Sequence, residues 1–201
     1  MDSSTQVSGF DFSAAMWVVC QDMASRLPEL SHIDMAAVAV GFSQTRKNVR
    51  HGLQASLTPM RFQGGALEGV RRGRRYTTQR QYAADGREYL YLLNFYLPRF
   101  LNHPLEEKLT TITHELWHIG PEFDGDLRRH EGRCYAHGPS ETEFDRVSVG
   151  LAQAWLALGP PHHVYAFLDH TFVELAAEHN GVYGKRIRTP RLIPVGRMTK
   201  Q

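Results

Sequence analysis

Long apolar runs are missing from this sequence, and their absence narrows the class of protein. No stretch of about 18 apolar residues occurs, so we expect no span across a membrane and no membrane partner. The segment Met1–Gly9 is polar and lacks the basic and apolar regions of a secretory signal. We therefore expect a cytoplasmic protein, in which Met1–Gly9 is disordered.

Cysteine is also scarce, which excludes a disulfide framework. Cys20 and Cys134 are the only two, and they lie far apart in the sequence. This usage is typical of a reducing compartment. We expect Cys134 to be a small buried side chain that fills space in the core, in preference to a ligand or a redox group. Internal repeats, low-complexity tracts and linkers are absent as well, so the 201 residues are predicted to form a single domain.

Net charge is low, but basic residues are clustered. The formal charge of +2 excludes a strongly polycationic protein. One cluster surrounds Gly73, and a second lies near the C-terminus: Arg71, Arg72, Arg74, Arg75 and Arg80, then Lys185, Arg186, Arg188 and Arg191. Such clusters can neutralise phosphates, so nucleic acid is one candidate partner, through the Arg71–Arg80 cluster. We favour the simpler interpretation that both are solvated surface segments.

One short motif carries most of the chemical information. Residues 114–118 read His-Glu-Leu-Trp-His, which is the H-E-x-x-H pattern. On a helix, residues four apart lie on one face, so His114 and His118 could grip one metal ion. Glu115 would then lie beside the water that a zinc ion activates. The pattern indicates a zinc-dependent hydrolase.

The residues around the motif predict a helix. Pro104 suits the first helical position, and Glu106 and Glu107 suit the first turn, where the helix dipole favours negative charge. Gly120-Pro121 ends the helix. A single apolar stripe recurs at spacings of four and three: Leu105, Leu109, Ile112, Leu116 and Ile119. At about 100° per residue the two histidines project away from this stripe, so we favour a metal site over two surface histidines.

A catalytic zinc ion usually takes three protein ligands, and the motif supplies only two. His130 is our first choice for the third, because it follows His118 in a segment rich in glycine and charge. His137 is the second choice. Glu141 is the third, since Glu141 and Asp145 form the E-x-x-x-D pattern of a second helix in thermolysin-like enzymes. Asp124 is the fourth, at the metzincin offset, although Pro121 stands where that pattern has glycine.

The motif and the segment after it resemble a known group. His114-Glu-Leu-Trp-His118-Ile, followed by Leu127-Arg-Arg-His130, is similar to the predicted metallopeptidases of phages and prokaryotes, in which H-E-L-x-H-I precedes an L-R-x-H element. The likeness extends to Gly41-Phe42, Arg50-His51 and Gly64-Gly65. It implies a zincin-like fold, with zinc on His114, His118 and His130 and with Glu115 as the catalytic residue.

A more distant resemblance is to SprT-like proteases. Their third histidine lies in an H-G-P element, which His137-Gly138-Pro139 repeats at a greater distance from His118. This likeness implies an alternative function, a protease associated with DNA. A non-catalytic zinc-binding module for nucleic acid or protein is a further alternative, although closed structural zinc sites favour four ligands and cysteine.

The leading hypothesis is a zinc metallopeptidase that acts on peptides or proteins. Glu115 would be the general base, accepting a proton from water and passing it to the leaving amine. The donor that stabilises the oxyanion is open among Tyr135, Arg128 and Arg129, although for each of them we favour a surface or structural role. The strand predicted over Tyr89–Leu97 is the candidate for lining the cleft and pairing with an extended peptide.

The remaining pattern predicts an α+β fold, with strands first and helices afterwards. Helices are expected at Phe10–Leu27, from Ser140 to about Leu158, and from about His163 to Glu178. Strands are expected at Ile33–Phe42, Leu53–Phe62 and Tyr89–Leu97. Gly64–Ala84 is predicted to be a basic loop or hairpin arm, and Val182–Val195 an extended tail or edge strand. We expect a small mixed or antiparallel sheet packed on the motif helix, with surface histidines at His162, His163, His170 and His179.

Overall fold

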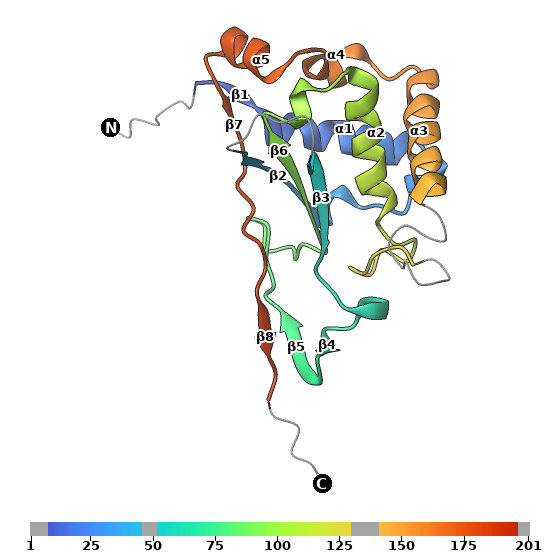
Figure 1. Cartoon of the computed structure of the whole chain (residues 1–201), viewed down its shortest axis with the longest axis vertical. Helices are drawn as coiled ribbons and strands as arrows, with labels where there is room; N and C mark the ends of the chain where they lie inside the picture. The colour runs from blue at the N-terminus through green and yellow to red at the C-terminus, as the bar shows by residue number, and fades with distance from the viewer. Residues whose placement is uncertain (1–7, 46–51, 130–140, 197–201) are drawn as a thin grey trace.

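The computed structural model describes residues 8–45, 52–129 and 141–196. It confirms the α+β class (Figure 1). The elements in chain order are β1 (Phe10–Asp11), α1 (Phe12–Arg26), β2 (Val38–Gln44), β3 (Ala55–Pro59), β4 (Glu68–Arg71), β5 (Arg74–Thr78), β6 (Tyr91–Leu97), α2 (Leu105–Trp117), α3 (Glu141–Ala157), α4 (His162–Tyr165), α5 (Phe172–His179), β7 (Val182–Tyr183) and β8 (Leu192–Pro194). Within these ranges, no helix is long and apolar enough to cross a bilayer.

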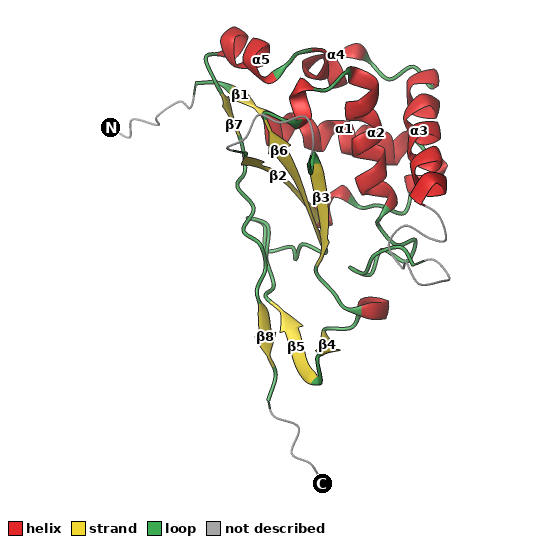
Figure 2. Ribbon diagram, viewed as in Figure 1, coloured by secondary structure: helices red, strands yellow, loops and turns green. Residues whose placement is uncertain are grey.

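The central sheet is small and mixed, as predicted. Its order is β2-β6-β3, with β2 parallel and β3 antiparallel to β6. Strand β6 is therefore in the middle, and Leu93 pairs with Val40 on one side and Leu57 on the other. The helices cover one face of this sheet (Figure 2). The apolar sequence of β6, Tyr-Leu-Leu-Asn-Phe-Tyr-Leu, suits a strand with neighbours on both sides.

Alternation along the strands divides the core between the two faces of the sheet. Val40, Leu93 and Phe95 belong to the main cluster, which also holds Met16 of α1 and Leu116 of α2. The neighbouring residues Ala39 and Leu92 belong to a second, smaller cluster with Met60. Cys20 is a buried free thiol of the main cluster, and burial raises its pKa to about 12. Cys134 lies outside the described residues.

The two edges of the central sheet differ. Beyond β2, the C-terminal segment runs alongside, and the Phe42 N–H donates to the Lys185 carbonyl at 3.1 Å. Gly41 permits this approach, because a Cβ there would lie 2.4 Å from the Lys185 oxygen. Beyond β3, no further strand pairs among the described residues. Pro59 fits this position, since proline is tolerated where the backbone nitrogen faces away from the ladder.

The basic arm is a second sheet that extends from the body of the molecule (Figure 1). Strands β4 and β5 form a hairpin, and β8 pairs with β5 on its other side. Arg72 and Gly73, both at positive φ, make the turn between β4 and β5. Within the predicted loop or hairpin arm, Gly64–Ala84, the structure forms this hairpin over Glu68–Thr78. The C-terminal tail is extended as predicted, with short pairings at β7 and β8.

The last predicted helix, from His163 to Glu178, was wrong as a single element. It is divided into α4, a 3-10 turn at Ala166–Asp169, and α5. The break lies at Thr171, which starts α5 with a reciprocal capping box to Glu174. A second helix start is favourable there because each side chain satisfies a backbone N–H that has no helical partner. Asn180 ends α5 in the left-handed conformation, which asparagine adopts more readily than most residues.

A buried lysine fixes α2 to the C-terminal helices. Lys108 is 2% exposed, and its Nζ donates to the carbonyls of Leu168 and His170, at 2.8 Å each. Burial lowers its pKa to about 8. We expect Lys108→Met to destabilise the protein by about 2–4 kcal/mol, because two carbonyls lose a charged donor. Chemical denaturation measures this, and an unchanged midpoint would contradict the role given to Lys108.

Candidate metal centre

The motif occupies the C-terminal end of α2, as the sequence predicts. His114 lies in the last turn, and His118 is the C-cap in helical conformation. The His118 N–H donates to the His114 carbonyl at 3.3 Å, so the helical turn continues through both residues. The i, i+4 relation is therefore kept, and both rings lie on the same side of the helix end.

The two imidazoles meet through their Nε2 atoms, which are 3.2 Å apart. Two Zn–N bonds of about 2.0–2.1 Å at a tetrahedral angle would place the nitrogens roughly 3.3 Å apart. The observed separation thus fits two ligands of one metal ion. The same separation equally suits a hydrogen bond between two neutral rings. The His114 side chain is 25% exposed, which leaves the pair open to solvent on one side.

Helix α3 packs against this pair. Phe144 stacks on His118, with ring centroids 4.5 Å apart, and meets the His114 ring at an angle, with centroids 4.7 Å apart. The next residue, Asp145, places Oδ1 3.6 Å from His114 Nδ1. A carboxylate on the second ring nitrogen favours a proton there, which leaves Nε2 free to act as a ligand. The aromatic ring also limits the directions in which the imidazoles can turn.

Glu115 is buried next to the edge strand. It is 8% exposed, and its carboxylate accepts a hydrogen bond from the Leu57 backbone N–H of β3. Burial raises the pKa of Glu115 to about 7, while the Leu57 hydrogen bond opposes the shift. A carboxyl group with this pKa can both accept and release a proton near neutral pH.

Strand β3, and not β6, borders the site. The prediction that the Tyr89–Leu97 strand pairs with an extended peptide was wrong, because β6 is paired on both sides. On either side of β3, the Gln54 carbonyl accepts from the Tyr96 N–H and the Met60 N–H donates to the Leu90 carbonyl. Backbone groups alternate along an antiparallel ladder, so those of Leu57 point away from β6, toward Glu115. Strand order depends on pairing between distant segments, which local patterns do not encode.

The segment after His118 folds back onto the end of α2. Ile119 forms a β-bridge with Leu127, and the Arg128 N–H donates to the His118 carbonyl at 2.7 Å. The Tyr91 hydroxyl of β6 holds the returning segment through two hydrogen bonds. It donates to the Asp126 carbonyl at 2.8 Å and accepts from the Gly125 N–H at 3.0 Å. This path brings the described chain back beside His118 just before residue 130.

Arg128 and Arg129, two of the three residues considered as oxyanion donors, have structural contacts. Arg128 Nε donates to the Trp117 carbonyl at 2.8 Å, and its guanidinium lies 3.6 Å from the centre of the Trp117 ring. Arg129 forms a bidentate pair with Asp126, at 2.7 and 2.9 Å. Both contacts hold the returning segment in place. Tyr135 lies outside the described residues.

The described side chains do not complete a metal site. Within residues 8–45, 52–129 and 141–196, no group of three His, Cys, Asp or Glu side chains is arranged to hold an ion. Asp124 is directed elsewhere, since its Oδ1 accepts from Asp126 N and its side chain packs on Gly65. His130, His137 and the side chain of Glu141 lie outside the described residues. On either side of that segment, the Arg128 N–H donates to the His118 carbonyl and the Phe144 ring stacks on the His118 ring.

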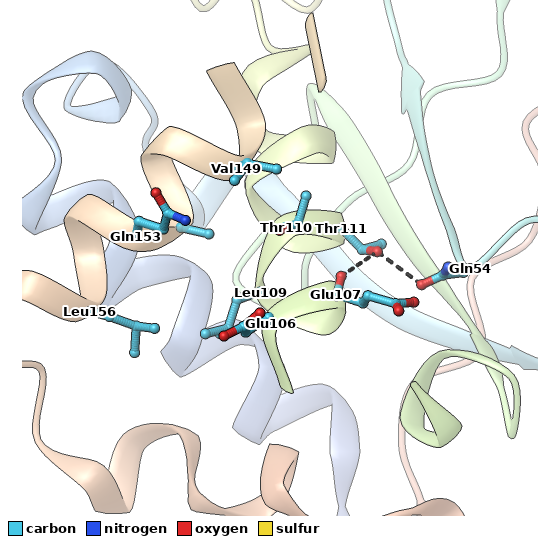
Figure 3. Close-up of a pocket in the computed structure, with 10 residues that line it drawn as sticks. Gln54, Glu106, Glu107, Leu109, Thr110, Thr111, Val149, Gln153 and Leu156 are labelled. Atoms are coloured by element: carbon cyan, nitrogen blue, oxygen red, sulfur yellow. Dashed lines mark hydrogen bonds between the residues drawn. The ribbon is translucent and has the colours of Figure 1, made fainter. Parts of the chain in front are cut away.

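A cavity of about 400 Å³ lies between α2 and α3, starting one turn before His114 (Figure 3). Leu109, Ala152 and Leu156 form its apolar part, and Glu106 and Gln153 are among its polar lining residues. Thr111 joins the cavity to β3, because its hydroxyl donates to the Gln54 side chain at 2.9 Å. No pattern in the sequence predicted this cavity, which depends on how two helices pack.

The remaining predicted residues are surface groups. His162 is 67% exposed and pairs with Asp169, while His170 and His179 each approach Glu178. These histidines are distributed over the C-terminal helices and form no metal-binding group in the described chain. No family model, curated protein or solved structure matches this chain.

Proposed function

We propose that this protein is a zinc-dependent metallopeptidase. One observation carries the proposal: two imidazole Nε2 atoms 3.2 Å apart lie on the helix end that also presents a buried carboxyl group, Glu115. His114 and His118 would hold the ion. A zinc ion, when bound, supplies Lewis acidity that acidifies water and polarises a carbonyl group. A zincin-like fold is part of the same proposal.

Residues of the chain would carry out proton transfer, orient the imidazoles and bind the substrate. Glu115 accepts a proton from the attacking water and returns it to the leaving amine, which its pKa of about 7 suits. Asp145 and Phe144 orient the imidazoles. Outward backbone groups of β3 other than the Leu57 N–H, which donates to Glu115, would pair with an extended peptide and place a scissile bond beside Glu115. The cavity between α2 and α3 would receive a substrate side chain.

The third ligand is proposed among His130, His137 and Glu141. The resemblance favours His130, and the chain returns to His118 two residues earlier. The position of Asp145 favours Glu141, because residues four apart lie on the same face of α3. The direct test of the whole proposal is metal analysis of the purified protein together with peptide-hydrolysis assays, in which a Glu115 variant is the inactive reference.

Asp145 offers a more specific test of the geometry. We expect Asp145→Asn to weaken zinc affinity by about 10–100-fold, as is usual when a carboxylate that orients a histidine ligand is lost. Competition with a chelator of known affinity measures this. Glu143→Gln is the matched control, since Glu143 lies on the same helix but pairs with Arg146. Equal zinc affinity in the two variants would exclude Asp145 from the site.

A further inference from the structure

The two basic segments of the sequence come together on the arm. Strand β8 pairs with β5, matching Thr77 with Ile193. The Gln79 N–H donates to the Arg191 carbonyl at 2.8 Å, and Gln81 Nε2 donates to the Arg188 carbonyl at 2.7 Å. The backbone that carries the C-terminal arginines is therefore held in place along the arm.

Two adjoining hollows of about 560 and 590 Å³ lie along this segment. Arg186, Arg188 and Thr189 line both of them. The other lining residues are Gln79, Gln81, Arg191, Ser43 and Ile187. Among the described residues, no acidic side chain lines either hollow. We call this surface the basic hollow.

Two other arginines of the arm are compensated by acids, and those of the basic hollow are not. Arg75 pairs with Glu68, and Arg80 pairs with Glu88. For Arg186, Arg188 and Arg191, the described part of the chain supplies no ion-pair partner. Three like charges on a fixed backbone repel one another unless an anion binds between them. This arrangement differs from an ordinary solvated strand face, in which both signs are mixed.

We propose that the basic hollow binds the phosphodiester backbone of a nucleic acid. A guanidinium group donates two parallel hydrogen bonds to a phosphate, and neighbouring amides such as Gln79 and Gln81 donate to phosphate or sugar oxygens. Arg186 and Arg188, two residues apart along an extended chain, are separated by about 6.6 Å, and Arg191 lies three residues further on, so each can meet a different phosphate. A concave polar surface suits a strand of phosphates better than a flat layer of lipid headgroups. The binding is independent of peptide hydrolysis.

This assignment differs from the one expected from the sequence, which placed nucleic acid on Arg71–Arg80. Two arginines of that cluster are neutralised by the ion pairs above. The other three, Arg71, Arg72 and Arg74, lie at the tip of the hairpin. The tip is thus a comparison surface of equal charge and provides a matched control.

The test uses the full chain and fluorescence anisotropy with two labelled probes, a 20-nucleotide single strand and a duplex of the same length. We expect binding at 50 mM salt that weakens steeply by 200 mM. The triple variant Arg186→Gln, Arg188→Gln, Arg191→Gln should bind about tenfold more weakly, with a salt slope smaller by about two to three. The two probes distinguish single-stranded from double-stranded partners.

Two control variants each remove three positive charges at other positions. One is Arg71→Gln, Arg72→Gln, Arg74→Gln at the tip, and the other is Arg26→Gln, Arg87→Gln, Arg146→Gln, whose arginines form ion pairs with acids. Both should bind nearly as the wild type does. If all three variants bound the probes equally weakly, the loss of binding would be an effect of net charge, and the proposal would be overturned. It is equally overturned if neither probe binds at 50 mM salt, or if only vesicles containing anionic lipid bind.

Discussion

Replacing Glu115 by glutamine should reduce peptide hydrolysis by about 10²–10⁴-fold and leave the zinc content unchanged. Glutamine has nearly the same shape, so it fits the buried position, and its side-chain oxygen can still accept the hydrogen bond from Leu57. What it lacks is a group that can take up and release a proton. The loss should therefore appear in kcat, with zinc bound in full.

The measurement pairs elemental analysis with the cleavage of an unstructured protein substrate. Glu122→Gln is the control, because Glu122 is an exposed acid in the segment just after the motif. If the Glu115 variant kept near-normal activity with a full complement of zinc, Glu115 would not be the base. If the wild type held zinc but cleaved nothing under any condition tested, a non-catalytic zinc-binding module would replace the peptidase.

Loss of His118 should have the second large effect, which is the loss of the metal. We expect His118→Asn to purify with little zinc, because it removes one of two ligands on the helix. The decrease in affinity should exceed the 10–100-fold range typical of outer-shell residues. Asparagine keeps a planar polar side chain against Phe144 and leaves a smaller cavity than alanine would. His162→Ala, at an exposed histidine on α4, should retain zinc.

The same zinc measurement orders the third-ligand candidates. Variants His130→Ala, His137→Ala, Glu141→Gln and Asp124→Asn are compared with the wild type. Loss of zinc in the first would support the ligand set implied by the phage-type resemblance. Retention in the first and loss in the third would support the arrangement suggested by Asp145 on α3. A full zinc content in His118→Asn would contradict the whole site.

Local sequence was sufficient for the part of the site that lies on one helix. The apolar stripe and the glycine-proline stop predicted α2, and the structure places it at Leu105–Trp117. The spacing of His114 and His118 alone predicted that their rings would meet. The contact with α3 had a weaker signal, the E-x-x-x-D pattern, which places Asp145 where it approaches His114. That pattern identifies Asp145 but does not predict how α3 is oriented relative to α2.

The rest of the fold depends on partners that are distant in the sequence. Lys108 lies among helix-forming residues, and nothing nearby predicts that its ammonium group is buried beneath Leu168 and His170. The hydrophobicity of Tyr91–Leu97 predicted a strand, but its central place follows from pairing with two other segments. In the last helical region, Thr171 and Glu174 form a capping pair, a start signal that the prediction of one helix from His163 to Glu178 did not use.

The tight passage at Gly41 has a consequence for how the sheet can grow. With the C-terminal segment lying across the outer side of β2, that border is closed to any additional strand. Among the described residues, the outer edge of β3 is therefore the border at which the proposed extended substrate could pair with the sheet. A stretch of backbone on the opposite border from the histidines would thus limit the proposed docking to one side.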